Sequence, residues 1–542
     1  MRKELPVPPA AAWAILRSRD GARRWLEDDR RGPIEVGAHF PVRGIGLATV
    51  SEIGPGMRIE IGFADGGTAA FEFSSVRDIT ALTLTTSPSV DSAALGWSHL
   101  LEVAALVLKR ALENRKPRQA IVIIHGIGNQ RPLATARRFT DSLVDRSERW
   151  SKPDKLSLSY ELRRYQLRRT RRRPRTDIYE LYWADKVSGT SMAHIFAWLR
   201  SQVRSPGNVS PALCPILYTA LALALVTVIA LLALVVVIGT DGFSSAWTEI
   251  TGFVVVSLLS AAITGLLVKT VGDAARYFDN DPENIAIRQS IREGGISLLR
   301  RLHNEGSYDR VVLVGHSLGS VIAYDLIRHY WVEVHREHGS PLTPVQPRLA
   351  AYRPGDLDAD GQKALWEENR VAGIPWLVTD LISIGSPLTH ARSLLARSEA
   401  DLEALRSELE LPTCPPRVRK DATFTEHYVV DGQRRSIRLL SDGCPFATTR
   451  WTNLYSPVRK GLFGDVVGGP LGPVFGDGVR DVEVPSSRWW RRWTLLAHTS
   501  YWRNDGREPD DSLTQLLEAV DLNSGPWLDR HTGDLPWTAS LR

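Results

Sequence analysis

The segment Val311-Val312-Leu313-Val314-Gly315-His316-Ser317-Leu318-Gly319-Ser320 carries the strongest structural signal in this chain. Its four aliphatic residues predict a buried strand, and the helical apolar spacing of residues 321–327 predicts a helix directly after it. The connecting turn leaves no room for a side chain at Gly315 or Gly319, and it strains the backbone of Ser317. We therefore expect the Ser317 hydroxyl at the end of a sheet, with the N–H of Leu318 where an oxyanion would form.

In this strand–turn–helix context, the pattern Gly-X-Ser-X-Gly at residues 315–319 resembles the nucleophile elbow of the α/β-hydrolase superfamily of serine esterases and lipases. The resemblance implies an α/β fold with a mostly parallel sheet. It also implies that a histidine activates the serine and that an acid orients the histidine. In this superfamily the order along the chain is serine, acid, histidine.

A second oxyanion-hole donor is expected from the loop after an earlier strand. Residues 120–124 are an apolar run that leads into His125, Gly126 and Ile127. A buried strand that ends in His-Gly is similar to the hydrolase strand whose following loop supplies the second N–H. The resemblance assigns that donor to Gly126 or Ile127.

The acid is expected in the loop that follows a later strand. Residues 381–388 and 450–457 have strand-like patterns, and the loop at residues 461–470 contains Asp465. Many relatives carry the acid nearer the end of that strand, but residues 456–458 offer none. We predict Asp465 as the catalytic acid, and Asp477 and Asp481 remain alternatives.

The base is expected after the last strand, residues 479–484, and His498 occupies that place. His390 is a rival base. His316 adjoins the nucleophile, but the geometry of the elbow is expected to point its ring elsewhere. Histidines and carboxylates nowhere have the spacing of metal ligands, so we predict no metal site and no cofactor.

Length and composition indicate a multidomain globular protein. The chain has 542 residues, which predicts two or three units, with 43% hydrophobic and 24% charged residues. The net charge of +6 is modest for this length. Cys214, Cys414 and Cys444 are too few for a disulfide framework and favour a reducing compartment. The N-terminus lacks the apolar core of a secretory signal.

Residues 1–113 are predicted to form a separate domain. Residues 48–53, 58–63, 69–73 and 80–85 alternate with the period of antiparallel strands, and an apolar helix is expected from about residue 96 to 112. The start Val7-Pro8-Pro9-Ala10-Ala11-Ala12-Trp13 and this closing helix resemble the START-like, polyketide-cyclase (SRPBCC) type of helix-grip fold. That resemblance implies an apolar ligand in a cavity between sheet and helix. The alternative is a core filled by side chains in a docking module.

Two uncharged apolar runs, residues 212–238 and 250–268, predict a transmembrane hairpin. About 20 helical residues cross the hydrocarbon core of a bilayer, and both runs reach about that length. Basic residues flank the pair on its outer sides, with Arg200 and Arg204 before it and Lys269 and Arg276 after it. The positive-inside rule then places all soluble parts on the cytoplasmic side of a two-pass membrane protein.

The most basic run, from Arg163 to Arg175, lies between two strand-like pieces. The plain interpretation is a solvated loop. Nucleic acid is not predicted as a partner, because neither an aromatic stacking platform nor a known binding fold accompanies the run. Anionic lipid headgroups fit better beside a transmembrane hairpin.

Together these patterns predict a membrane-anchored serine hydrolase that cleaves an ester with a lipid-like acyl group. The predicted units are a START-like domain (1–113), a linker (114–119), the first part of the hydrolase (120–205), the transmembrane hairpin (206–270) and the second part of the hydrolase (271–542). Because fold does not establish function, a non-catalytic membrane scaffold or lipid-binding protein on a hydrolase fold is the rival hypothesis.

Overall fold

The structure is a computed structural model of the whole chain, and its described residues are the following. They are 2–5, 9–17, 34–42, 46–54, 58–63, 66–76, 79–87, 104, 118–126, 131–157, 159, 161–170, 173–186, 225, 229, 232, 251, 254, 277, 282–304, 308–338, 359–371, 374–396, 398–417, 423–430, 433–459, 464–465, 467–484, 497–501, 511–520 and 522.

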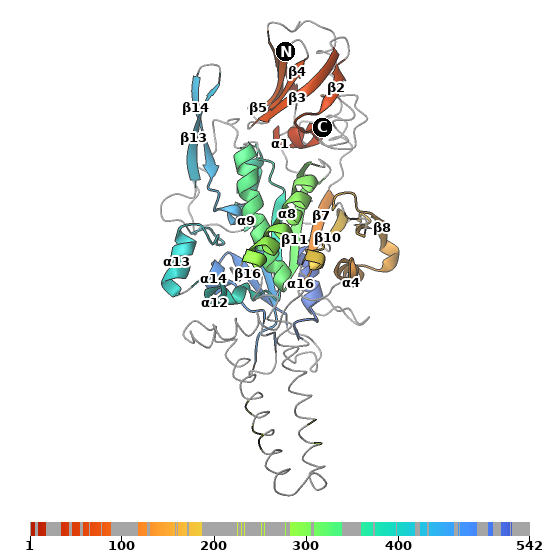
Figure 1. The fold of residues 1–542 in the computed structure, drawn as a ribbon, viewed down its shortest axis with the longest axis vertical. Helices are drawn as coiled ribbons and strands as arrows, with labels where there is room; N and C mark the ends of the chain where they lie inside the picture. The colour runs from red at the N-terminus through yellow and green to blue at the C-terminus, as the bar shows by residue number, and fades with distance from the viewer. Residues whose placement is uncertain are drawn as a thin grey trace.

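An eight-stranded mixed sheet forms the centre of the molecule (Figure 1). Six neighbouring strands are parallel, and two antiparallel strands extend one edge. In spatial order the strands are β16 (Val479–Glu483), β15 (Arg450–Tyr455), β12 (Val378–Ile384), β11 (Arg310–His316), β7 (Arg118–Ile124), β10 (Arg175–Leu181), β9 (Arg163–Leu167) and β8 (Arg149–Pro153). Because the parallel strands run the same way, their carboxyl ends meet along one edge.

Helices cover both faces of this sheet. Alternate residues of β7 pack against different helices. Val122 lies in the hydrophobic cluster that includes α8 (Pro282–Asn304) and α9 (Leu318–His338). Ile123 lies in the cluster that includes α4 (Ala134–Leu143) and α16 (Asp511–Ala519). Strands that are buried on both faces become continuous apolar runs, which is why the patterns before Gly126 and Ser317 could be read as strands.

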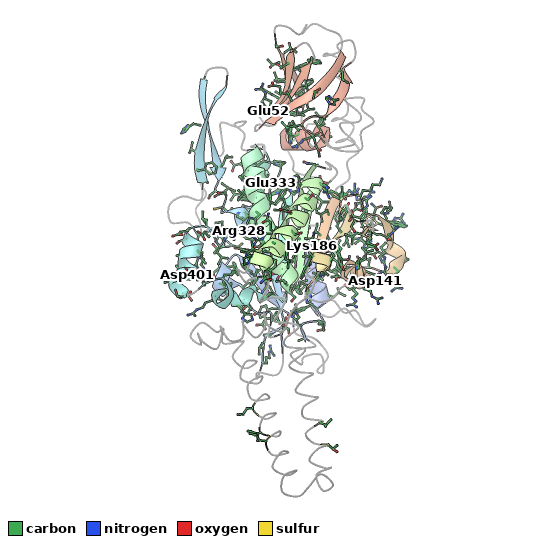
Figure 2. The ribbon with its side chains drawn as sticks, viewed as in Figure 1. Glu52, Asp141, Lys186, Arg328, Glu333 and Asp401 are labelled. Atoms are coloured by element: carbon green, nitrogen blue, oxygen red, sulfur yellow. The ribbon has the colours of Figure 1, made fainter. Side chains whose placement is uncertain are left out.

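Polar side chains join α8 to its neighbours. Glu333 of α9 forms an ion pair with Arg300 at 2.6 Å, and Lys186 donates a hydrogen bond to Ser290 at 3.1 Å; Figure 2 labels Glu333 and Lys186. Further elements are described in this part of the chain. They are η1 (Arg146–Glu148), η2 (Ala184–Lys186), α11 (Ala359–Val371), η4 (Pro387–His390), α12 (Ala391–Leu395), α13 (Glu399–Ser407), the hairpin β13 (Thr423–Val430) and β14 (Gln433–Leu440), η5 (Pro445–Ala447) and α14 (Gly472–Phe475).

The N-terminal unit is a six-stranded antiparallel sheet with the helix α1 (Pro9–Arg17) packed on it, and α1 also contacts α8 and α11. The strand order is β1 (Arg2–Leu5), β6 (Ile79–Thr86), β5 (Thr68–Val76), β4 (Arg58–Phe63), β3 (Gly46–Gly54) and β2 (His39–Val42). The four predicted strands lie within β3 to β6. The expected closing helix lies outside the described residues except for Ala104, which is helical and fully buried.

The predicted fold class needs correction in its transmembrane hairpin. Within the described part of the chain, no helix combines the length and the apolar character needed to cross a membrane. Of residues 206–270, the structure describes only residues 225, 229, 232, 251 and 254. Hydropathy alone suggested the hairpin, and the two-pass topology inferred from it stays a prediction.

The sheet is mixed, because the start of the arginine-rich run is a strand where a solvated loop was the plain interpretation. This strand is β9 (Arg163–Leu167), which pairs antiparallel with both β10 and β8. Two arginines of the run are held inside the fold: Arg164 contacts the buried Asp177 at 2.8 Å, and Arg173 contacts Glu148 at 2.6 Å. Burying the guanidinium groups in ion pairs allows a basic sequence to extend a sheet.

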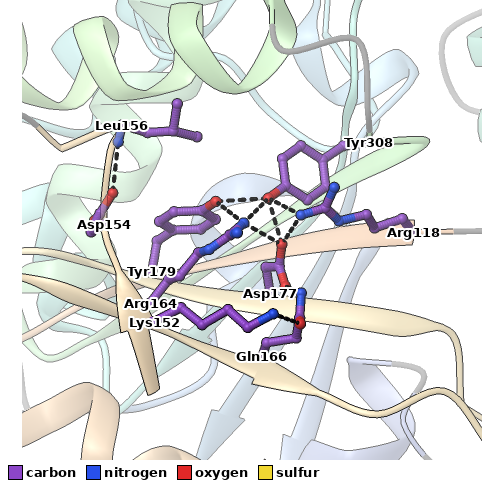
Figure 3. Close-up of polar contacts among 9 residues, drawn as sticks. All are labelled: Arg118, Lys152, Asp154, Leu156, Arg164, Gln166, Asp177, Tyr179 and Tyr308. Atoms are coloured by element: carbon purple, nitrogen blue, oxygen red, sulfur yellow. Dashed lines mark hydrogen bonds and ion pairs between the residues drawn. The ribbon is translucent and has the colours of Figure 1, made fainter. Parts of the chain in front are cut away.

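A buried polar network ties this antiparallel extension to the parallel strands (Figure 3). The carboxylate of Asp177 accepts hydrogen bonds from Arg118 and Arg164, from the hydroxyl of Tyr308 at 2.7 Å and from Gln166 at 2.8 Å. These side chains come from β7, β9, β10 and the residues before β11. The network lies near the amino ends of the parallel strands, opposite the edge that carries Ser317.

Candidate active site

Ser317 sits in a strained turn between β11 and α9. Its φ of 52° is in the left-handed region, which residues other than glycine rarely adopt. A Cβ on Gly315 would lie 2.4 Å from the carbonyl oxygen of Gly319, and one on Gly319 would lie 2.2 Å from that of Ile124. The strand, the helix and the steric requirement for both glycines are therefore as predicted from the sequence.

Neighbouring strands hold the turn in place. The N–H of Ser317 donates to the carbonyl of Ile384 at 2.9 Å, and its own carbonyl accepts from the Ser320 hydroxyl at 2.5 Å. Gly126 approaches from the end of β7, where a Cβ would lie 2.8 Å from Cβ of Ser317. The ends of β7, β11 and β12 thus converge on the serine.

His498 and Asp465 form a buried hydrogen-bonded pair. Nδ1 of His498 lies 2.9 Å from Oδ2 of Asp465, which is completely buried. Because an ionised carboxylate only accepts, Nδ1 carries the proton and the lone pair is left on Nε2. The pair lies against the end of β12: a Cβ on Gly385 would lie 2.8 Å from Oδ2 and 3.2 Å from Nδ1. His498 thus packs beside Gly385, and the backbone N–H of Ser317 donates a hydrogen bond to the residue before it, Ile384.

Electrostatics keep Asp465 ionised. Burial alone would raise its pKa, but the charge of His498 and hydrogen bonds from His498, Tyr501 and the N–H of Val467 lower the pKa below its usual value. The carboxylate can therefore accept a hydrogen bond from Nδ1–H of His498 throughout the neutral pH range.

Two other histidines of this region are neutral. Burial is the main cause that lowers the pKa of His125 to about 4 and the pKa of His316 to about 3. His125 stacks on Trp183 at 4.9 Å. The ring of His316 does not point away from the site as expected, because its Nε2 donates to the backbone carbonyl of His498 at 2.9 Å. His316 therefore fixes the backbone that carries the candidate base.

The structure brings Ser317 and His498 to the same edge without joining them. Their described side chains share no hydrogen bond, although His316, the neighbour of Ser317, has its ring 5.0 Å from that of His498. Catalytic hydrogen bonds are often long before substrate binds.

Of the three predicted oxyanion-hole donors, the structure describes Leu318 and Gly126. Leu318 is the first residue of α9, so its N–H has no acceptor within the helix, and the positive end of the helix dipole lies beside Ser317. Gly126 lies close enough to Ser317 to contribute, because a Cβ on Gly126 would lie 2.8 Å from Cβ of Ser317. Ile127, the other predicted donor, lies outside the described residues.

The alternative acid Asp481 has a structural position. It accepts hydrogen bonds from the N–H groups of Leu471 and Gly472 and from Asn453 at 2.7 Å. Asp477 is exposed in a turn. The rival base His390 ends η4, and no hydrogen bond links it to Ser317 or Asp465 in the residues described.

Sequence reasoning missed Tyr501. Its hydroxyl donates to Oδ2 of Asp465 at 2.7 Å and accepts from the N–H of Ser456 at 3.0 Å. The signal that could have found it is its position three residues after His498, which places both side chains on the same turn. As for metals, the described residues contain no group of three or more histidine, cysteine or acidic side chains that could hold an ion.

The packing around Gly319 predicts a change in stability. Replacing Gly319 with alanine forces Cβ against the backbone of Ile124, and overpacking of this kind costs about 1–3 kcal/mol. Gly294→Ala on α8 is the matched control, since its Cβ would meet only the end of Lys186 at 3.8 Å. Alanine there is expected to stabilise the helix by up to about 1 kcal/mol. Chemical denaturation measures both, and equal stabilities would contradict this packing.

Comparisons with known proteins identify no relative of the whole chain. No family model matches it, and no curated protein is significantly similar to it.

Some solved structures resemble a small part of it. The Aha1 dimer from Colwellia psychrerythraea is 22% identical with a TM-score of 0.18, and the match covers 21% of this chain and 94% of that one. CalU16 from Micromonospora echinospora is 18% identical with a TM-score of 0.17, covering 21% of this chain and 76% of that one. These are Aha1- and polyketide-cyclase-like, SRPBCC-type proteins that weakly match the N-terminal region. None of these comparisons shows an α/β-hydrolase domain. Likenesses this weak carry no argument about function.

Proposed function

We propose that this protein is a serine hydrolase that cleaves esters through an acyl-enzyme at Ser317. The observation that carries the proposal is the buried Asp465–His498 pair at the same sheet edge as the strained Ser317. A serine at positive φ between two glycines is the geometry of a nucleophile elbow, and the proposal includes the α/β-hydrolase resemblance on that ground.

In the proposed mechanism, Nε2 of His498 takes the proton as Oγ of Ser317 attacks the ester carbonyl. The negative charge on the former carbonyl oxygen faces the N–H of Leu318 at the start of α9. Collapse of the tetrahedral intermediate breaks the bond to the alcohol, which leaves with the proton from His498. Water, deprotonated by the same imidazole, then attacks the acyl-enzyme and restores Ser317.

The finer part of the proposal is that the acyl group is lipid-like. The test compares p-nitrophenyl acetate, butyrate, octanoate and dodecanoate, with Ser317→Ala as the blank for each. A binding site for a lipid-like acyl chain should raise kcat/KM with chain length, by up to about fourfold for each buried methylene. A preference for acetate would exclude the lipid-like acyl group and leave a short-chain esterase. Blank-level rates on all four esters would contradict the serine hydrolase itself.

A second candidate is a non-catalytic protein on this fold. It is favoured by one observation, the missing hydrogen bond between Ser317 and His498 in the described structure. The buried acid that leaves the lone pair of His498 on Nε2 favours the enzyme.

A further inference from the structure

The acid of the candidate triad has more donors than a simple serine–histidine–acid arrangement requires. Oδ2 of Asp465 accepts from Nδ1 of His498 at 2.9 Å and from the hydroxyl of Tyr501 at 2.7 Å. Oδ1 accepts from the N–H of Val467 at 2.9 Å. Tyr501 and His498 therefore share one oxygen atom.

The direction of the tyrosine hydrogen bond is fixed by its surroundings. The N–H of Ser456 donates to Oη of Tyr501 at 3.0 Å, and the single proton of the phenol is donated to Oδ2 of Asp465. The ring is buried between His316, whose centroid is 6.2 Å away, and Gly385, where a Cβ would lie 2.9 Å from Cε2 of the tyrosine.

We propose that Tyr501 is a positioning residue: by sharing Oδ2 of Asp465 with His498, it sets how strongly the carboxylate stabilises the protonated imidazole. This inference rests on the proposed function for its catalytic meaning. The hydrogen bond from Tyr501 draws electron density away from Oδ2 and holds the carboxylate in one orientation. His498 is thereby oriented while remaining easy to deprotonate.

Among the residues that the structure describes, several titratable groups lie around the pair. Asp465, Tyr501 and His316 face His498, and His125 acts on His316 from the end of β7. Burial and the charge of Asp465 raise the pKa of Tyr501 well above its usual value, while both other histidines are neutral.

The test is the titration of His498 in Tyr501→Phe, followed by NMR on full-length protein with isotope-labelled histidine. Loss of one signal in His498→Gln assigns the resonance. Without the phenol, Asp465 becomes a stronger acceptor and favours the imidazolium. The midpoint should rise by about one pH unit, because a hydrogen bond to a charged group is worth about one to two pKa units and only part of it reaches the imidazole. The rate of Ser317 labelling by a fluorophosphonate should fall off at low pH. The midpoint of that fall should move to higher pH by the same amount.

Tyr324→Phe is the matched control, since it also removes a buried hydroxyl, one that donates to the carbonyl of Pro412 at 2.9 Å. Its His498 midpoint should equal that of the wild type. An unchanged or lowered midpoint in folded Tyr501→Phe would overturn the inference, whatever happens to the rate. A raised midpoint in a protein whose Ser317 never reacts would support the role of Tyr501 and refute the hydrolase.

Discussion

Replacing Asp465 with asparagine should lower the turnover of p-nitrophenyl butyrate by about 10⁴-fold while the protein stays folded. The reason lies in the donors around the carboxylate. Because the N–H of Val467 needs an acceptor, the asparagine oxygen takes the place of Oδ1, and its NH₂ group then faces His498 and Tyr501. Nδ1 of His498 must become the acceptor. The proton moves to Nε2, and Ser317 loses its base.

Asp477→Asn is the control for this loss, because Asp477 is an exposed turn residue in the same region of the chain. Its turnover should equal that of the wild type. If Asp465→Asn, shown by circular dichroism to be folded, kept more than about a tenth of the activity, another acid would have to orient the histidine. A comparable loss in Asp481→Asn without unfolding would name that acid.

Replacing Asp177 with asparagine should lower the free energy of unfolding by about 3–5 kcal/mol, the usual result of removing one partner from a buried ion pair. The change leaves the guanidinium groups of Arg118 and Arg164 beside each other without the anion between them. Denaturant unfolding measures the loss. The reaction of Ser317 in the remaining folded protein should be unaffected, since the network lies at the opposite edge of the sheet.

The matched control is Glu72→Gln, which removes a surface ion pair with Arg58 at 3.5 Å and should cost no more than about 1 kcal/mol. The pH dependence gives a second check. Burial would raise the pKa of Asp177, but Arg118 and Arg164 lower it below its usual 3.8. The carboxylate therefore stabilises the fold above the unfolded pKa, and this stability is lost as pH falls through the folded pKa. Asp177→Asn should flatten that acid limb. An equally small effect in both variants would contradict the structural role of the network.

Local sterics made the elbow predictable from sequence. A Cβ on Gly315 or Gly319 would collide with backbone atoms, so these two positions require glycine. The sequence pattern shows that requirement directly. The apolar strands β7 and β11 were readable for a similar reason, because burial on both faces requires uninterrupted apolar residues. The proximity of Asp465 to His498 followed only from the order of acid and histidine in a resembling superfamily, and no local pattern encodes it.

What could not be predicted depends on contacts between distant residues. Arg164 in a basic run looks solvated until Asp177 of the next strand is placed beside it, and Tyr308 joins them from far along the chain. Likewise, the position of Tyr501 three residues after His498 places it near the base, but the acceptor of its hydroxyl, Asp465, comes from a distant loop. Hydropathy predicted a transmembrane hairpin at residues 206–270, but apolar length alone does not identify a membrane span.

The most direct test of the account is to treat the full-length protein with a fluorophosphonate and to map the adduct by mass spectrometry of its peptides. We predict one phosphonyl group on Ser317, absent when the protein is unfolded first and absent from the Ser317→Ala variant. A folded protein that gains no adduct, or that carries it on another residue, would contradict the claim that Ser317 is an activated nucleophile.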